Sequence, residues 1–501
     1  MNARTVSRAR PTFDLAWLLA AGVGAAIIVS LASYEFGVLG SLVAAVVPAV
    51  LGWLLYVSRY ARAALVRLRP DLTSLSFLLM LLLAGMCVEA MLPDISERTA
   101  QQLNESPFNL VNLIRAATVA VTGLLGGSLA IRYASRIGDA LRGPMAGIAL
   151  YAAAAVVSAG YASSPVVSAG KAFELAADAL LGLLLAGLLS TQRIVAVWNV
   201  LWLYLGGMVV ALWVGTALNP SEAFDTAGGT AMILHGWRPQ IAPNTLGQYG
   251  VCLCVVACAR LLARAAQRSI ERTIFWGGVF GLGLVTIAGA QARTTAAALP
   301  LVLGVCFYLH RRWRLLATSL AAGGLLGLSA AGTFALDFLR RNQSLEQLTT
   351  LSGRLNYWAA AWQFFTESKW LGHGYYTSTR LDLNARFIYT GLDLSTVDNT
   401  YLEALLGVGI VGVVPLVAGL VGLGWLAARA LRSRQLDVEA RDYTIEIVCV
   451  LLVVLVRSLT GSTFQRHSEN LLLVVAATAF FHSLWRTRRV PTVPTAQVAR
   501  R

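Results

Sequence analysis

Residues 337–376 read DFLRRNQSLEQLTTLSGRLNYWAAAWQFFTESKWLGHGYY, and residues 377–412 continue with TSTRLDLNARFIYTGLDLSTVDNTYLEALLGVGIVG. This stretch is long, polar and rich in arginine and aromatic residues, whereas the sequence on both sides is apolar enough to lie in lipid. A loop of this kind between hydrophobic spans usually carries chemistry or recognition. We therefore expect the function of the chain to depend on it.

The composition of the whole chain determines the class of protein. Hydrophobic residues make up 57% and charged residues 13%, and the mean hydropathy is +0.66. The apolar residues fall in runs of about twenty, which is the length an α-helix needs to cross a hydrocarbon core of roughly 30 Å. A β-barrel would show shorter segments of alternating hydropathy instead. We predict an all-α polytopic membrane protein with about 12–14 transmembrane helices and one large periplasmic loop that carries an amphipathic helix.

Fourteen apolar runs have the character of spans, and they divide the chain into four parts. The predicted spans lie near residues 14–34, 36–57, 72–92, 109–131, 145–163, 172–190, 196–218, 246–263, 273–291, 296–310, 315–336, 400–428, 443–464 and 471–485. The predicted parts are a transmembrane bundle over 1–336 (spans 1–11), the large loop over 337–399, C-terminal transmembrane helices over 400–485 and a cytoplasmic tail over 486–501.

The large loop itself contains one helical pattern. Leu355, Trp358, Trp362 and Phe365 recur at the spacing of one helix face. Such a face could lie along the outer leaflet of the membrane, and it could equally pack on the spans of the protein itself.

The basic residues indicate the orientation. The net charge of +15 would suggest nucleic acid in a soluble protein, but here most of the 40 lysines and arginines fall in alternate loops. Cytoplasmic loops of membrane proteins carry such an excess. We therefore expect both termini in the cytoplasm, the 337–399 loop on the outer side of the membrane (the periplasm if the cell is Gram-negative), no cleavable signal peptide and no nucleic-acid partner.

The sequence disfavours a disulfide framework, a zinc site and a transporter with duplicated halves. All six cysteines lie inside apolar runs and none forms a CxxC pair, so neither a disulfide framework nor a zinc site is indicated. We expect no metal and no cofactor. No internal repeat is visible, which argues against a transporter or lipid-linked sugar flippase built from duplicated halves.

Charges at the outer ends of spans are costly in hydrocarbon and therefore informative. Four arginines belong at similar outer depth: Arg238, Arg293, Arg354 and Arg457. Guanidinium groups that converge there could hold the phosphate oxygens of a diphosphate in a bidentate way. The alternative is that each of them simply extends to the membrane interface.

An acceptor hydroxyl that attacks an activated sugar needs a general base. The candidates on the outer side are His373, Asp398, Glu403 and His467. Asp398 lies where the loop enters span twelve, and a helix N-terminus favours an ionised carboxylate, although a capping role alone would explain it too. His373 between two glycines is also typical of a turn. Lys171, Glu174 and Asp178, at helical spacing, are interpreted as a local ion-paired face.

Five segments, in this order, resemble the O-antigen ligase and O-antigen polymerase family of bacterial envelope glycosyltransferases. They are RPQIAPNTLGQYG (238–250), AGAQARTTAAALPLVLG (288–304), SGRLNYWAAAWQFF (352–365), WLGHGYY (370–376) and VDNTYLEALLGVGIVG (397–412). The third is similar to the family's "Gly-Arg … Trp" start of the large loop, and the last to its entry into the following helix. The resemblance covers about residues 238–412.

The resemblance implies a GT-C-like fold and an inverting, metal-independent glycosyl transfer from a glycan on undecaprenyl diphosphate. It implies catalytic roles for Arg293 and Arg354, and Asp398 could serve as the base. His373, Asn399 and Tyr401 would contact the diphosphate or glycan; Arg238 and Arg457 join this group because of their depth rather than a motif.

One departure from the family pattern bears on the product. Ligases of this family carry a histidine where this chain has Asp398. This difference favours a polymerase of O-antigen or exopolysaccharide repeat units over a ligase that transfers the glycan to lipid A-core. Transfer to a protein serine and polysaccharide transport stay open as further alternatives. The expected partners are the lipid-linked donor, a glycan or lipid A-core acceptor, membrane lipids and a chain-length regulator.

Overall fold

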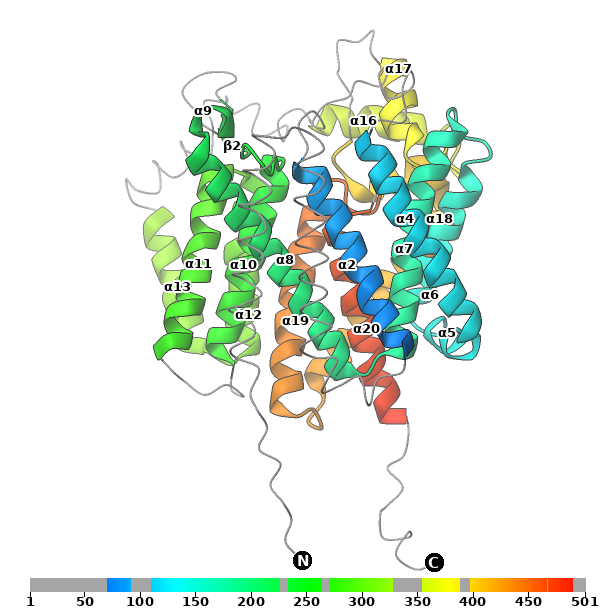
Figure 1. Cartoon of the computed structure of the whole chain (residues 1–501). Coiled ribbons are helices and arrows are strands. Elements are labelled where there is room, and N and C mark those ends of the chain that lie inside the picture. The colour runs from blue at the N-terminus through cyan, green and yellow to red at the C-terminus, as the bar shows by residue number, and fades with distance from the viewer. Residues whose placement is uncertain are drawn as a thin grey trace, which may run out of the picture.

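The computed structural model describes residues 70–91, 110–225, 233–263, 270–327, 354–387, 397–465 and 467–489. In these ranges the chain forms a bundle of helices with one small antiparallel hairpin, β1–β2. The long helices run roughly along one direction, and α16 and α17 lie at one end of the bundle (Figure 1). We call this the loop end. The predicted spans 14–34 and 36–57 and both chain termini lie outside the described residues.

The described elements follow the predicted spans closely. The N-terminal half contains α2 (Pro70–Met91), α4 (Leu110–Arg132), α5 (Ala134–Ala140), α6 (Met145–Ser158), α7 (Pro165–Leu188), α8 (Thr191–Leu218), α9 (Pro220–Ala223), β1 (Phe224–Asp225) and β2 (Ile233–Leu234). The C-terminal half contains α10 (Pro243–Leu262), α11 (Ile270–Ala290), α12 (Arg293–Leu309), α13 (Trp313–Gly327), α16 (Arg354–Phe365), the π-helical turn η1 (Ser378–Asp382), α17 (Leu383–Phe387), α18 (Thr400–Arg432), α19 (Val438–Ser458) and α20 (Glu469–Arg489). The prediction of an all-α polytopic membrane protein is thereby confirmed.

Fewer helices meet a strict criterion for crossing a membrane than the predicted 12–14. Within the described residues, five helices are long and apolar enough, or six when α5 and α6 count as one span bent by 103°. Several remaining helices are shorter, such as α12, or contain charged residues, such as Glu174 and Asp178 in α7. The polar residues that lower the hydropathy of these helices are therefore of interest for function.

The helices approach closely where glycines face one another. In the crossing of α6 and α18, a Cβ added to Gly147 would collide with the carbonyl of Pro415 and lie 2.7 Å from Cα of Gly419. Small residues of this kind let membrane helices pack backbone to backbone. In the same crossing, a Cβ added to Gly412 on α18 would lie 3.1 Å from Cβ of Ala154 on α6.

The far end of the bundle contains a buried polar network. Nε and Nη2 of Arg260 on α10 donate to Oε2 and Oε1 of Glu446 on α19, both at 2.8 Å. The Arg260 guanidinium also lies 4.8 and 5.0 Å from the ring centroids of Trp202 and Trp276. A buried ion pair needs such additional partners to offset its desolvation. The network joins α8, α10, α11 and α19.

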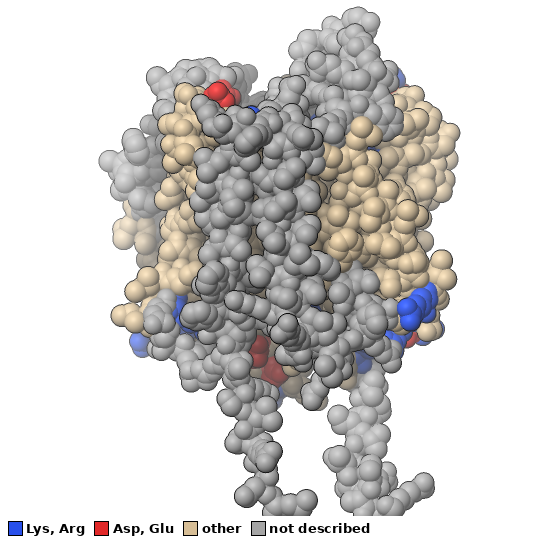
Figure 2. All heavy atoms as spheres, viewed as in Figure 1, with Lys and Arg blue, Asp and Glu red and all other residues tan. Residues whose placement is uncertain are grey.

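Basic side chains are concentrated at this far end. Figure 2 shows described Lys and Arg residues along the lower rim, below a broad band of uncharged residues. Helices α4, α10 and α18 all carry arginine in their last turn, at the end opposite the loop end (Figure 1). Charged rims around an apolar band are what a membrane-embedded bundle requires.

Helix α18 is interrupted near its start, and backbone groups of the preceding loop form hydrogen bonds beside the interruption. Gly409 has φ 62°, so the helix is not continuous there. The backbone of residues 369–374 lies against this break: His373 N donates to Leu406 O at 2.7 Å, and Ile410 N donates to Lys369 O at 2.9 Å. A side chain at Gly409 would collide with the carbonyl of Trp370. The loop and the first turns of α18 therefore form one unit.

Candidate functional site

Helix α16 holds the segment that enters α18. The predicted amphipathic helix forms, and Phe364 and Phe365 are buried against the start of α18, while Leu355 and Trp362 are 44% and 55% exposed. Nε1 of Trp358 donates to Val397 O at 3.0 Å. Arg354 lies one turn earlier on the same face. It can therefore reach the next residue, Asp398.

Arg354 and Asp398 form an ion pair. Nη2 of Arg354 lies 2.9 Å from Oδ2 of Asp398, and the two side chains are 20% and 34% exposed. Asp398 has φ 51°, a left-handed conformation that Asp adopts more readily than most residues. Its neighbour Asn399 caps α18, because Oδ1 accepts from the backbone N of Tyr401 and of Leu402, both at 3.1 Å. Since Asn399 performs the capping, the carboxylate of Asp398 is available for other contacts.

Two further arginines lie within electrostatic reach of this pair. Arg354 repels both Arg293, the first residue of α12, and Arg457, in the last turn of α19. Asp398, Glu403 and Glu469 attract Arg457. Arg354 on α16 is thus within electrostatic range of Arg293 on α12 and of Arg457 on α19, and carboxylates partly neutralise Arg354 and Arg457.

The side chain of Arg457 is held by the segment after α19. Its Nη1 donates to the carbonyl of Thr460. Gly461 lies directly against the guanidinium, so that any Cβ at this position would occupy the space of Arg457. A glycine at 461 is therefore required for this orientation of Arg457.

The same segment, residues 459–468, is tied to the start of α18. The hydroxyl of Thr400 donates to Gly461 O and accepts from Thr463 N. Oγ of Ser462 donates to Oε1 of Glu403 at 2.6 Å, and Glu403 is fully buried. Asp398 and Arg457 are therefore positioned by one connected set of backbone and side-chain contacts.

The structure gives the other predicted residues different surroundings. The guanidinium of Arg238 lies 5.1 Å from the ring centroid of Trp237, in the segment that leads from the β1–β2 hairpin to α10. His373 stacks on Phe364 with centroids 3.8 Å apart, and its Nε2 is 2.9 Å from Phe364 O. These contacts of His373 correspond to the turn role. Tyr401, in the first turn of α18, is partly buried.

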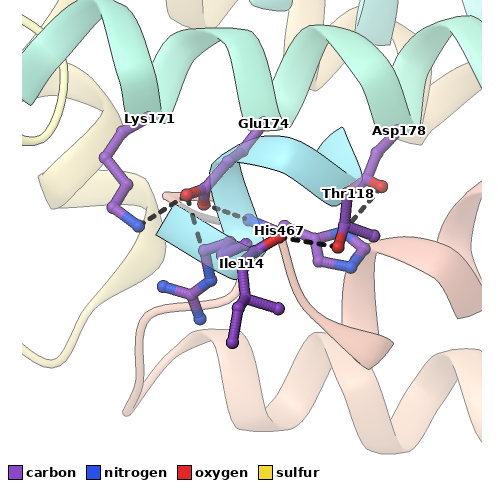
Figure 3. Close-up of polar contacts among 7 residues, drawn as sticks. Ile114, Thr118, Lys171, Glu174, Asp178 and His467 are labelled. Carbon is purple, nitrogen blue, oxygen red and sulfur yellow. Dashed lines mark hydrogen bonds and ion pairs between the residues drawn. The ribbon is translucent and has the colours of Figure 1, made fainter. Parts of the chain in front are cut away.

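A second polar cluster, which we call the His467 cluster, lies between α4, α7 and the segment before α20 (Figure 3). It contains Arg115, Lys171, Glu174, Asp178 and His467. Nδ1 of His467 lies 2.8 Å from Oδ1 of Asp178, and the backbone N of His467 donates to Oε2 of Glu174 at 3.3 Å. Lys171 donates to Oε1 of Glu174 at 2.7 Å, and Arg115 lies 3.9 Å from the same oxygen.

The expectation of an ion-paired face on α7 agrees with these contacts, but two partners were missed. Arg115 in the apolar run of α4 was a visible signal, because an arginine there needs a counter-charge. The pairing of His467 with Asp178 crosses 289 residues and had no local signal. Burial by itself lowers the pKa of His467, but the charge and hydrogen bond of Asp178 outweigh it and raise the pKa above its usual value.

No group of three or more His, Cys, Asp or Glu side chains with the arrangement of a metal site occurs in the described ranges. The charged and titratable groups described at the loop end include arginines, carboxylates and an imidazole.

Residues 278–417 match the family described as O-antigen ligase. The matched range includes Arg293, Arg354, Asp398 and the broken start of α18. A search of curated proteins found no match. The resemblance drawn from the sequence is confirmed for this segment, and the match indicates an enzyme that transfers glycosyl groups in a membrane.

Proposed function

We propose, from the O-antigen ligase domain at residues 278–417, that the chain polymerises oligosaccharide repeat units carried on undecaprenyl diphosphate. The observation that carries this proposal is the Arg354–Asp398 ion pair with Arg293 and Arg457 within electrostatic reach. A diphosphate needs several guanidinium groups, and the acceptor hydroxyl needs a base nearby. Both kinds of group are present at this one place.

The donor diphosphate would compete with Asp398 for Arg354. In the free protein the carboxylate of Asp398 neutralises this arginine. Phosphate oxygens offer the guanidinium a bidentate partner of higher charge, and their arrival would leave the carboxylate facing the acceptor. In this way donor binding itself would prepare the base.

The transfer step then uses groups already in place. The acceptor hydroxyl oxygen attacks the anomeric carbon from the face opposite the diphosphate, which inverts the configuration. The bond between the anomeric carbon and the phosphate oxygen breaks, and undecaprenyl diphosphate leaves. Asp398 takes the proton of the hydroxyl, while the arginines stabilise the negative charge that develops on the leaving group. No metal is needed in this scheme.

Orientation follows from the charge distribution. The arginine-rich ends of α4, α10 and α18 would face the cytoplasm of a bacterial inner membrane. The loop end would then lie on the periplasmic side, where lipid-linked repeat units are joined. Both termini would be cytoplasmic.

Polymerase and ligase differ in what accepts the glycan. The family description favours a ligase, whereas an aspartate at 398, where ligases of the family carry histidine, favours a polymerase. The surface polysaccharide of a deletion strain separates the two. Loss of a polymerase leaves single repeat units on the final acceptor, whereas loss of a ligase leaves polymer on undecaprenyl diphosphate.

The test of the site uses variants in the deletion strain. Arg354→Ala and Arg293→Ala should abolish long-chain polysaccharide while the protein still reaches the membrane. Arg386→Ala is the matched control, because Arg386 pairs with Glu367 in the same loop region and both side chains are about 40% exposed. Such a pair contributes little to stability. Normal chain-length ladders in the Arg354 and Arg293 variants would refute the proposal.

A further inference from the structure

One imidazole nitrogen in the His467 cluster is buried without a hydrogen bond. The side chain of His467 is 3% exposed and that of Asp178 fully buried. Nδ1 is held by Asp178, whereas Nε2 has no hydrogen-bond partner in the described part of the chain. Figure 3 shows this second nitrogen turned away from Asp178. Buried polar atoms are nearly always satisfied, so this exception requires an explanation.

The rest of the cluster is already paired. Glu174 accepts from Lys171 and lies beside Arg115, and it also receives the backbone N of His467. Asp178 is occupied by Nδ1. These contacts fix the position and orientation of the ring, and they leave Nε2 as its one polar atom without a hydrogen bond among the described residues.

The His467 cluster is continuous with the arginine site. Residues 457–467 carry Arg457 at one end and His467 at the other, and Ser462 and Gly461 between them contact the start of α18. The hydroxyl of Tyr375 donates to Phe464 O at 2.8 Å in the middle of this segment. Tyr375 lies within electrostatic range of Glu403 and also of Asp178 and Glu174. Both groups of residues therefore belong to one polar layer.

We propose that Nε2 of His467, oriented by Asp178, binds a hydroxyl group of the acceptor glycan. This inference rests on the proposed glycosyl transfer and adds the acceptor side of the site. A sugar hydroxyl fits because it can both donate and accept. It can donate to Nε2 of the neutral ring and accept from Nε2–H of the charged ring, so it pairs in either protonation state.

The experiment uses the full-length protein in lipid nanodiscs with two separate substrates. The donor is the lipid-linked glycan, and the acceptor probe is a repeat-unit oligosaccharide on a simple alkyl group without diphosphate, which cannot serve as donor. His467→Asn keeps an amide near the position of Nδ1 and removes Nε2, whereas His467→Gln places its amide near Nε2. KM for the acceptor, kcat and donor affinity are measured for each variant.

We expect His467→Asn to raise KM for the acceptor by about tenfold or more, because a buried partner is lost. His467→Gln should recover part of this loss, and donor affinity should stay unchanged in both. Asp178→Asn, which releases the ring, should also raise the acceptor KM.

The control is His482→Asn on α20. His482 is also buried, and its Nδ1 also has no hydrogen-bond partner in the described residues, but it lies beside Gly143 after α5, away from the loop end. It should leave the acceptor KM unchanged. An unchanged acceptor KM in His467→Asn, or an equal change in His482→Asn, would overturn the inference. Arg354→Ala tests the proposed glycosyl transfer separately from the acceptor contact. If Arg354→Ala loses activity while His467→Asn keeps the wild-type acceptor KM, the acceptor role of His467 is refuted and the proposed function is not.

Discussion

Arg354 in the first turn of α16 and Asp398 just before α18 are joined by an ion pair of 2.9 Å across 44 residues of chain. Neither residue is placed by its own helix alone. Trp358 fixes Val397, Asn399 caps α18, and the backbone of residues 369–374 holds the broken start of that helix. The pair therefore depends on tertiary contacts that bring a loop helix and a membrane helix together.

Asp398→Asn should separate the two roles of this residue. The amide can still accept a hydrogen bond from Arg354, so the fold and donor binding should stay near those of the wild type. It cannot take a proton, and kcat should fall by about 10²-fold or more. The measurement is the rate of glycan joining at saturating donor. A kcat within twofold of the wild type would exclude Asp398 as the base.

Gly461→Ala should weaken donor binding without unfolding the protein. The added methyl group would occupy the space of the Arg457 guanidinium, which is the mobile end of a long side chain and can move aside. We expect KM for the donor to rise by about tenfold, the loss of one charge-assisted contact. Gly170→Ala, where the Cβ would meet no neighbouring atom, is the control. Equal donor KM values for the two variants would contradict the role given to Arg457.

Gly409→Ala should destabilise the loop end. At φ 62° an L-residue is strained, and the methyl group would collide with the carbonyl of Trp370. A strained backbone position costs about 1–3 kcal/mol. The thermal midpoint in detergent should fall, whereas Gly424→Ala, in open space on the same helix, should leave it unchanged or raise it slightly. Similar midpoints for both variants would show that the break is not needed.

Glu446→Gln should be strongly destabilising. It leaves the charge of Arg260 buried with no carboxylate, and breaking a buried pair costs about 3–5 kcal/mol. The comparison variant is Asp139→Asn, because the Arg142–Asp139 pair is 79% and 58% exposed and such pairs contribute about 0–1 kcal/mol. The measurement is the thermal midpoint of unfolding of each purified variant, compared with that of the wild type. If Glu446→Gln lowers the midpoint only as little as the exposed pair is expected to, the network at the far end is not a strongly stabilising element.

Most helices could be predicted from the sequence because an apolar run of spanning length is a local signal. Twelve of the fourteen predicted spans overlap a described helix, and the other two lie outside the described residues. The ion pair of Lys171 with Glu174 could be predicted for the same reason, since residues three apart share a helix face. The turn role of His373 followed from its two neighbouring glycines.

The neighbours of each side chain across the bundle could not be predicted. Depth in the membrane grouped Arg238 with the other three arginines, but depth gives no position around the bundle axis; the contact of Arg238 in the structure is with the ring of Trp237. The partners of His467 could not be predicted either, because Asp178 lies 289 residues away in the sequence, although His467 itself was a candidate base. The break in α18 had a signal in the glycines at 407 and 409, but the segment that fills it did not.

The most direct test of the central claim is binding of undecaprenyl diphosphate, without any glycan, to the purified protein in nanodiscs. The account predicts that Arg293→Ala, Arg354→Ala and Arg457→Ala each weaken binding about tenfold or more, since each removes a charge-assisted contact. Arg386→Ala should bind as the wild type does. Wild-type affinity in a variant that lacks all three arginines would contradict the claim that they hold the diphosphate together.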